Sequence, residues 1–167
     1  MSQDLSIEHP EYVFFSTTRT MNSRLWFINS PKLQERICAY LAKYQEIYEV
    51  IIYAFIIMGN HYHLLARFPK CNKRAFFKDF NSIIALLTDS YVEEFEGGKL
   101  WGRRVRSQVV GDASDVMDRF FYTVLNPVGA GICNKISDYT GYNCFHDAAH
   151  GINREYEIID FKDYNNR

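Results

Sequence analysis

The chain has 167 residues, of which 47% are hydrophobic and 16% aromatic, so it is long enough and apolar enough to bury a core. Its net charge is −1, and none of its apolar runs approaches the roughly 18 residues of a membrane helix. These properties favour one globular domain over residues 1–167 with no membrane span. The first residues lack a signal pattern, which makes the cytoplasm the expected location.

The charged residues are unevenly distributed along the chain. Nine basic and five acidic residues lie between Arg67 and Arg106, whereas residues 151–167 form an acidic tail beyond a core of about residues 12–150. A local basic patch binds phosphates even in a protein that is neutral overall. The basic segment therefore predicts a site for a polyanion, and a solvated charged face is the competing interpretation.

Four cysteines are scattered without a C-x-x-C pair, which argues against a zinc ribbon and against a disulfide scaffold. Cys144, His146 and His150 are close together in the sequence and leave a zinc site as an alternative. The sequence contains no second pair of cysteines that would support such a zinc site.

The first predicted elements are a strand and a helix. Residues 12–19 are rich in aromatic and β-branched side chains, as strands are. Ser30 and Pro31 are typical of a helix start, because a hydroxyl caps free backbone N–H groups and proline suits the first helical position. Apolar residues at helical spacing extend this helix to about Tyr48.

A hairpin is predicted next. Residues 50–58 lack polar alternation, which indicates a strand buried on both faces. Gly59 and Asn60 then turn the chain into an antiparallel strand that begins with two histidines, His61 and His63. This strand is expected in the middle of the sheet.

Two further helices complete the predicted elements. The second helix covers about residues 74–95, and an extended segment at residues 107–110 follows three arginines. The third helix runs from about Asp115 to Asn126, since the residue before Pro127 is pushed out of helical geometry. The order of elements is typical of an α+β fold of the ferredoxin-like or RRM-like plan. Its antiparallel sheet would carry the helices on one face and leave the histidine face open.

The two histidines of the predicted central strand project from the same face, because successive side chains alternate. Tyr62, Leu64 and Ala66 project from the other face, where they can pack on a core. Neighbouring imidazoles on a rigid strand form half of a metal site. For His-x-His alone, two polar residues on a solvated sheet face are an equally good interpretation.

The third helix has one apolar face on the helical wheel, formed by Met117, Phe120, Phe121 and Val124. Tyr122 lies on the opposite side, in line with Asp118 and Asn126. An exposed phenol on a rigid helix can act as a nucleophile when a cation or a base is close. A metal at the histidines would polarise the phosphate under attack, and Asn126 is placed to give it an oxygen ligand.

These residues resemble a known family. Residues 58–65, M-G-N-H-Y-H-L-L, resemble the M-P-N-H-x-H-L-L motif of REP-associated tyrosine transposases, which are IS200-like HUH transposases of single-stranded DNA. Residues 100–104, L-W-G-R-R, are similar to the family's L-W-x-R-R. Residues 122–131, Y-T-V-L-N-P-V-G-A-G, are similar to its Y-I-x-x-N-P-V-R-A-G. The matches follow the family's order.

The resemblance implies a transposase or endonuclease that cleaves and rejoins single-stranded DNA at hairpin-forming repeats through a 5′-phosphotyrosine. It implies Tyr122 as the nucleophile, with His61, His63 and Asn126 as ligands of Mg²⁺ or Mn²⁺. Ligand softness alone does not select magnesium for two imidazoles, and by that rule manganese or zinc fits as well as the ion that the resemblance implies. The side chains expected to hold the DNA are basic, namely Arg19, Lys73, Arg74, Lys78, Arg103, Arg104 and Arg106.

The chain departs from the family pattern at three positions that bear on DNA binding more than on chemistry. Gly59 stands for proline, Tyr62 for an aliphatic residue and Gly129 for a common arginine. Two other functions fit the sequence: a domesticated relative that binds hairpin DNA without cleaving it, and a phosphodiesterase that uses water as its nucleophile. The chain is expected to act as a monomer or a homodimer.

Overall fold

One antiparallel sheet organises the fold. The computed structural model describes residues 7–28 and 30–158, and its strands are β1 (Val13–Arg19), β2 (Ile51–Ile57), β3 (His61–Arg67) and β4 (Arg106–Val110). They lie in the order β2-β3-β1-β4, so β3, which carries both histidines, is a central strand. Every pairing is antiparallel. The predicted α+β, ferredoxin-like architecture is confirmed.

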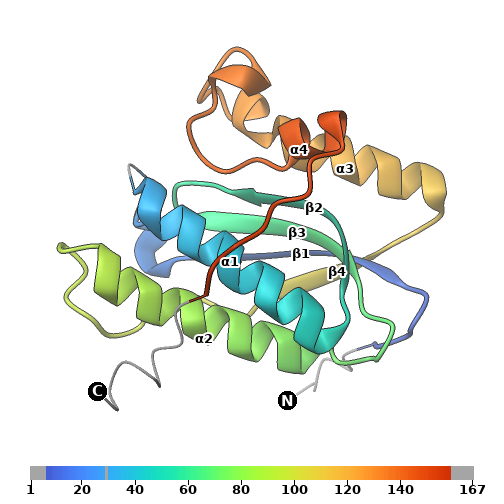
Figure 1. The fold of residues 1–167 in the computed structure, drawn as a ribbon, viewed down its shortest axis with the longest axis horizontal. Coiled ribbons are helices and arrows are strands. Elements are labelled where there is room, and N and C mark those ends of the chain that lie inside the picture. The colour runs from blue at the N-terminus through green and yellow to red at the C-terminus, as the bar shows by residue number, and fades with distance from the viewer. Residues whose placement is uncertain (1–6, 29, 159–167) are drawn as a thin grey trace.

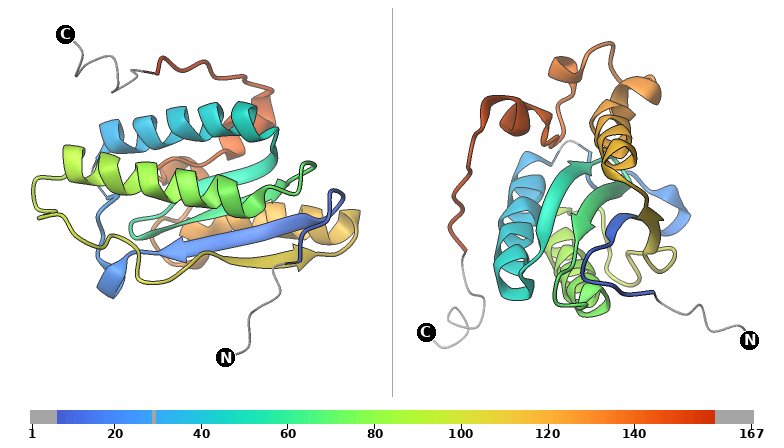
Figure 2. Two further views of the ribbon diagram at one scale, coloured as in Figure 1. Left: turned by 90° about the horizontal axis from the view of Figure 1, so that it is seen from below. Right: turned by 90° about the vertical axis from the view of Figure 1, so that its right-hand side faces the viewer.

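Helices lie on both faces of this sheet. They are α1 (Pro31–Tyr48), α2 (Lys73–Tyr91), α3 (Ala113–Gly129) and the short α4 (Phe145–His150), with 3-10 turns at Met21–Ser23 and Ile136–Asp138. The two long helices α1 and α2 lie side by side on one face, and α3 crosses the other (Figures 1 and 2). None of these described helices is long and apolar enough to cross a membrane.

The larger core fills the space between the sheet and the layer of α1 and α2. Alternation along β3 sends Tyr62, Leu64 and Ala66 into it, and each is at most 1% exposed. The Tyr62 ring packs against Phe80, and its hydroxyl donates to Oδ1 of Asn81 at 2.8 Å. The core-facing side of the histidine strand is therefore as predicted.

A smaller apolar cluster lies on the opposite face of the sheet. Phe15 and Leu65 belong to it, and Phe120 of α3 packs against it. His61 and His63 share this face, because they alternate with the buried side chains of β3. The expectation that the histidine face is open is therefore wrong. Helix α3 covers part of it and brings its own side chains next to the histidines.

Helix α3 continues three residues beyond its predicted end at Asn126. Pro127 lacks a backbone N–H and removes one helical hydrogen bond, but the helix runs on to Gly129. Its last turn is closed by the Ala130 N–H, which donates to the Asn126 carbonyl at 2.9 Å. The proline ring is buried against the rest of the fold.

The buried face of α3 also differs from the predicted one. Val124 is fully buried and Phe120 is half-buried, but Met117 and Phe121 are 56% and 46% exposed. Thr123 is buried instead. The buried stripe is rotated from the wheel's apolar face because α3 packs over the small cluster rather than over a broad core.

Residues 151–158 run past α1 (Figures 1 and 2). There, Nη1 of Arg36 donates to the Glu157 carbonyl at 3.1 Å. The predicted acidic tail extends further, and its Asp160 and Asp163 lie outside the described residues.

Asp112 caps the N-terminus of α3. Its Oδ1 accepts from the backbone N–H groups of Ser114 and Asp115 at 2.9 and 3.1 Å, and Asp115 completes a capping box. We expect Asp112→Ala to lower the free energy of unfolding by about 1 kcal/mol, as measured by urea denaturation. Ser114→Ala is the matched control, because its hydroxyl makes no hydrogen bond within residues 7–28 and 30–158. Equal losses in both variants would contradict the capping role.

Candidate active site

Asn60 organises the turn that leads into β3. Its backbone carbonyl accepts from the Thr20 N–H at 2.9 Å, and its Nδ2 donates to the Ser23 carbonyl at 3.0 Å. Its Oδ1 lies 2.6 Å from Nδ1 of His61. An amide oxygen accepts and cannot donate, so His61 carries its proton on Nδ1 and presents the lone pair of Nε2. The turn therefore sets both the position and the tautomer of His61.

His63 is held between an aromatic ring and the other histidine. Its ring stacks on Phe15, with centroids 5.1 Å apart and planes at 18°, and lies 4.9 Å from the His61 ring. It is 7% exposed, and neither of its ring nitrogens has a hydrogen-bond partner in the described part of the chain. Buried polar atoms are nearly always paired. These nitrogens therefore suit a metal ion or a substrate group.

Both imidazoles are held in the neutral form. Burial lowers the pKa of His63 to about 3, with smaller contributions from His61 and from the charge of Arg19. Burial also lowers the pKa of His61 to about 4, again with a contribution from Arg19. A neutral imidazole keeps the lone pair that binds a metal. The pair is thus suited to hold a divalent cation near neutral pH.

Tyr122 of α3 lies beside this histidine pair. Its ring meets the rings of Phe15 and His63 edge-on, with centroids 5.7 and 6.1 Å apart. The side chain is 51% exposed, as the helical wheel predicted. The hairpin and the third helix, which are far apart in the sequence, therefore meet at one place on the surface.

Asn126 follows Tyr122 by one turn of α3 and lies on the same side of that helix. It is half-buried, and its carboxamide makes no hydrogen bond with the residues that the structure describes. No group of three His, Cys, Asp or Glu side chains within that part of the chain could hold a metal ion. A metal at His61 and His63 would need another type of ligand, and an amide oxygen is one.

Arginines flank the histidine pair along the sheet. Arg19 is the register partner of His61, and Arg106 is opposite Thr17, which in turn pairs with His63. Directly paired residues of antiparallel strands share a face. Arg103 and Arg104 lie in the segment before β4, where the Arg103 carbonyl accepts from the hydroxyl of Thr18 at 3.2 Å. All four arginines are exposed.

The predicted DNA-binding residues of α2 lie elsewhere. Arg74 and Lys78 are exposed on α2, in the layer on the other face of the sheet (Figure 2). Lys73 is only 8% exposed, and its Nζ lies 3.8 Å from the centre of the Phe14 ring. Burial lowers the pKa of this lysine. The structure therefore corrects the prediction for Lys73, whose ammonium packs in the fold instead of facing a ligand.

Arg119 also belongs to the site, although no sequence motif singles it out. Its guanidinium carbon lies 5.1 Å from the centre of the Phe15 ring and 5.6 Å from that of Tyr122. Its Nη2 donates to Oε1 of Gln108 on β4 at 3.3 Å. The available signal was its position three residues before Tyr122, which places it on the same side of a helix.

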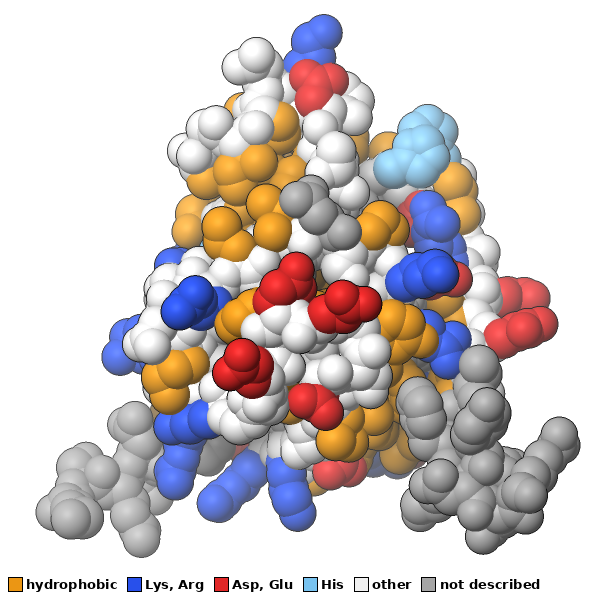
Figure 3. Space-filling view, turned by 90° about the vertical axis from the view of Figure 1, so that its left-hand side faces the viewer, with side chains coloured by type: hydrophobic (Ala, Val, Ile, Leu, Met, Phe, Trp, Pro, Cys, Tyr) orange, Lys and Arg blue, Asp and Glu red, His pale blue; other side chains and the backbone are white. Residues whose placement is uncertain are grey.

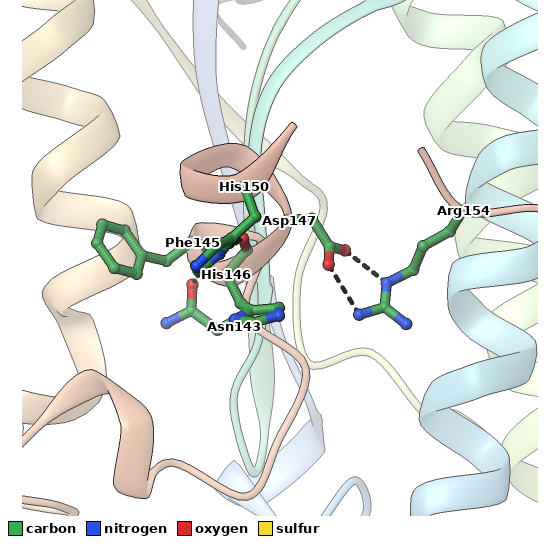
Figure 4. Close-up of polar contacts among 6 residues, drawn as sticks. All are labelled: Asn143, Phe145, His146, Asp147, His150 and Arg154. Atoms are coloured by element: carbon green, nitrogen blue, oxygen red, sulfur yellow. Dashed lines mark hydrogen bonds and ion pairs between the residues drawn. The ribbon is translucent and has the colours of Figure 1, made fainter. Parts of the chain in front are cut away.

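A second pair of histidines stands at the surface on α4 (Figure 3). The rings of His146 and His150 lie 4.4 Å apart, and Asp147 forms two hydrogen bonds with Arg154 (Figure 4). Sγ of Cys144 instead accepts from a backbone N–H of β2 at 3.3 Å. The described residues hold no three-ligand cluster here, so the alternative zinc site does not assemble.

The sequence matches the family model of the IS200-like transposases over residues 17–120. This stretch contains both histidines and the arginine segment, and it ends two residues before Tyr122. No curated protein matches the chain.

Two solved structures are similar to the chain to different degrees. A REP-associated tyrosine transposase bound to a REP hairpin has a TM-score of 0.73 at 16% sequence identity, covering 96% of this chain and 95% of that one. A candidate transposase from Deinococcus radiodurans has a TM-score of 0.49 at 14% identity, covering 71% of this chain and 92% of that one. The first likeness establishes a common fold over nearly the whole chain.

The lowered histidine pKa values predict a pH-dependent stability. The ordinary pKa of histidine is 6.5, and the folded values are about 4 for His61 and about 3 for His63. At a pH between the ordinary and the folded values, the unfolded chain binds more protons at these two side chains than the folded chain does. We therefore expect the free energy of unfolding to decrease as the pH falls from about 7 to about 5, as measured by urea denaturation at each pH. The double variant His61→Asn/His63→Asn should lose most of this slope. An unchanged slope would show that other groups cause it.

Proposed function

The chain belongs to the IS200-like transposase family and is therefore a DNA-processing enzyme, and we propose that it cuts and rejoins single-stranded DNA with Tyr122 as its nucleophile. The observation that carries this proposal is the position of an exposed Tyr122 ring 6.1 Å from the ring of His63. A phosphodiester at the surface can reach the phenol and the imidazoles together.

The proposed reaction exchanges one phosphodiester for another. Oη of Tyr122 attacks the phosphorus, the P–O3′ bond breaks, and the proton lost by the phenol is balanced by the one that the leaving 3′-oxygen takes up. One strand end then carries a 3′-hydroxyl, and the other is held as a 5′-phosphotyrosine. A second 3′-hydroxyl can reverse this step, so strands are rejoined without ATP.

His61 and His63 are the residues proposed to hold a divalent metal, Mg²⁺ or Mn²⁺, with Asn126 as a third, oxygen ligand. The family is generally metal-dependent. When bound, such an ion polarises the phosphate under attack. Asn60 directs Nε2 of His61 to this role, because it holds the proton of that ring on Nδ1.

The proposed substrate is single-stranded DNA with a hairpin, as in the superposable transposase bound to a REP hairpin. Arg19 and Arg106 share the face of the histidines, and Arg103 and Arg104 follow Gly102, whose N–H donates to the Arg19 carbonyl. These arginines would bind the phosphates that flank the cut. Such contacts make binding strongly dependent on salt. Arg74 and Lys78 would contact only DNA that reaches around to α2.

Incubation with labelled hairpin-bearing single-stranded DNA and Mn²⁺ tests the chemistry. We expect the wild-type protein to form a protein–DNA adduct that survives denaturing electrophoresis, because a phosphotyrosine is covalent. Tyr122→Phe and addition of a chelator should each abolish it. Tyr91→Phe, which changes another exposed tyrosine, should leave it intact.

Three outcomes of this assay would contradict the proposal, each for a different reason. Adduct formation by Tyr122→Phe would place the nucleophile elsewhere. Cleavage without an adduct would indicate water as the nucleophile. Tight binding without cleavage, unaffected by the chelator, would indicate a domesticated DNA-binding protein.

The placement of the arginines predicts which charges matter for affinity. We expect Arg103→Ala/Arg104→Ala to weaken single-stranded DNA binding at least about ten-fold. The negative slope of log K against log[salt] should become shallower by about 1.4, because two phosphate contacts are lost. Fluorescence anisotropy over a salt series measures both quantities. Arg74→Ala/Lys78→Ala removes the same charge from α2 and should have the smaller effect. Equal effects would contradict a DNA path centred on the histidine face.

A further inference from the structure

A groove lies beside Tyr122, between the edge strand β4 and the first half of α3. Its volume is about 500 Å³, and the polar side chains that line it include those of Gln108, Asp115, Asp118 and Arg119. Tyr122 is also one of the residues that line it. This volume is larger than that of a nucleobase, and the proposed nucleophile is part of the lining.

The polar groups of the groove differ in whether they already have hydrogen-bond partners. Arg119 donates to Oε1 of Gln108, which leaves the Nε2 donors of Gln108 available. Asp115 accepts from the Asp112 N–H in the capping box. Asp118 is exposed, and its carboxylate has no partner among residues 7–28 and 30–158. The groove therefore offers one unpaired carboxylate facing the same space as an arginine and an amide donor.

The charges in the groove distinguish a base from a phosphate. Asp115 and Asp118 place two carboxylates along it, and a phosphate there would be repelled by both. The exposed arginines before and within β4 already offer phosphates a better site. A ligand of this groove must instead donate hydrogen bonds to a carboxylate and accept them from an arginine or an amide.

Guanine is the base that meets this requirement best. Its N1–H and N2–H₂ groups are adjacent donors, which match the two oxygens of one carboxylate, and its O6 and N7 are acceptors for arginine. Adenine, cytosine and thymine each lack the adjacent pair of donors. We infer that the groove binds a guanine that neighbours the phosphodiester attacked by Tyr122, with Asp118 on its N1–N2 edge and Arg119 with Gln108 on its O6–N7 edge.

This inference rests on the proposed function for the position of the guanine in the substrate, but its chemistry can be tested without cleavage. The probe is a set of mononucleotides, dGMP, dAMP, dCMP, dTMP and dIMP, titrated into the wild-type protein and followed by the NMR signals of the Gln108 side-chain amide and the Arg119 Nε–H. We expect dGMP to bind about ten-fold more tightly than dAMP, since one bidentate contact discriminates by about that factor. dIMP, which lacks the 2-amino group, should bind more weakly than dGMP.

Two variants make the result specific. Asp118→Asn replaces one acceptor by a donor and should abolish the preference for dGMP over dAMP. Asp89→Asn makes the same change on the exposed surface of α2 and should preserve it. Equal binding of all the nucleotides, or an unchanged preference in Asp118→Asn, would overturn the inference.

The position of the guanine is tested by sequencing. A hairpin oligonucleotide with a randomised flank is incubated with protein and Mn²⁺, and the DNA in the covalent adducts is sequenced. We expect guanine to be enriched at one position beside the cut with wild type and not with Asp118→Asn. Adducts without such enrichment would overturn the inference and leave the proposed function intact. A failure to form any adduct would count against the proposed function, while the nucleotide titration still decides whether the groove binds guanine.

Discussion

The alternation of side chains along β3 is the constraint on which the rest of the structure depends. It sends Tyr62 and Leu64 into the core under α1 and α2, and it directs His61 and His63 to the face that α3 crosses. A slip of one residue would exchange the two sets, exposing large apolar side chains and burying both imidazoles in the main core. Because β3 is paired with β1 on one side and β2 on the other, its register is held along its whole length.

The electrostatics of the site follow from this arrangement. Arg19 stands opposite His61 across the β1–β3 ladder, where its charge adds to burial in lowering the pKa of both histidines. An arginine suited to attract a phosphate therefore also keeps the imidazoles neutral and able to bind a metal. The first half of α3 carries negative charge instead, because the carboxylates of Asp115 and Asp118 line its groove. The phosphates of a bound strand would thus lie on the arginine side of Tyr122, and a base would lie on the side of the carboxylates.

The sequence predicted what local rules determine and missed what depends on tertiary packing. Strand alternation, the Gly-Asn turn and the exposure of Tyr122 follow from periodicities that act over a few residues. Helix α3 extends past its predicted end, with Pro127 buried in its last turn. Phe121 is exposed although the helical wheel predicts it to be buried, because a wheel does not show which surface the helix will cover. Lys73 and Arg119 also depend on tertiary packing. The ammonium of Lys73 packs over the Phe14 ring, and Arg119 lies over Tyr122 in a helix that packs on the sheet.

The central claim is that the histidine pair and Tyr122 form one metal-dependent site. Crystals of the wild-type protein soaked in Mn²⁺, with diffraction recorded at a wavelength where manganese scatters anomalously, test it most directly. The account predicts one strong anomalous peak within bonding distance of Nε2 of His61 and of a ring nitrogen of His63, on the side that faces Tyr122. A peak at the surface histidines of α4 with none at His61 and His63 would contradict it.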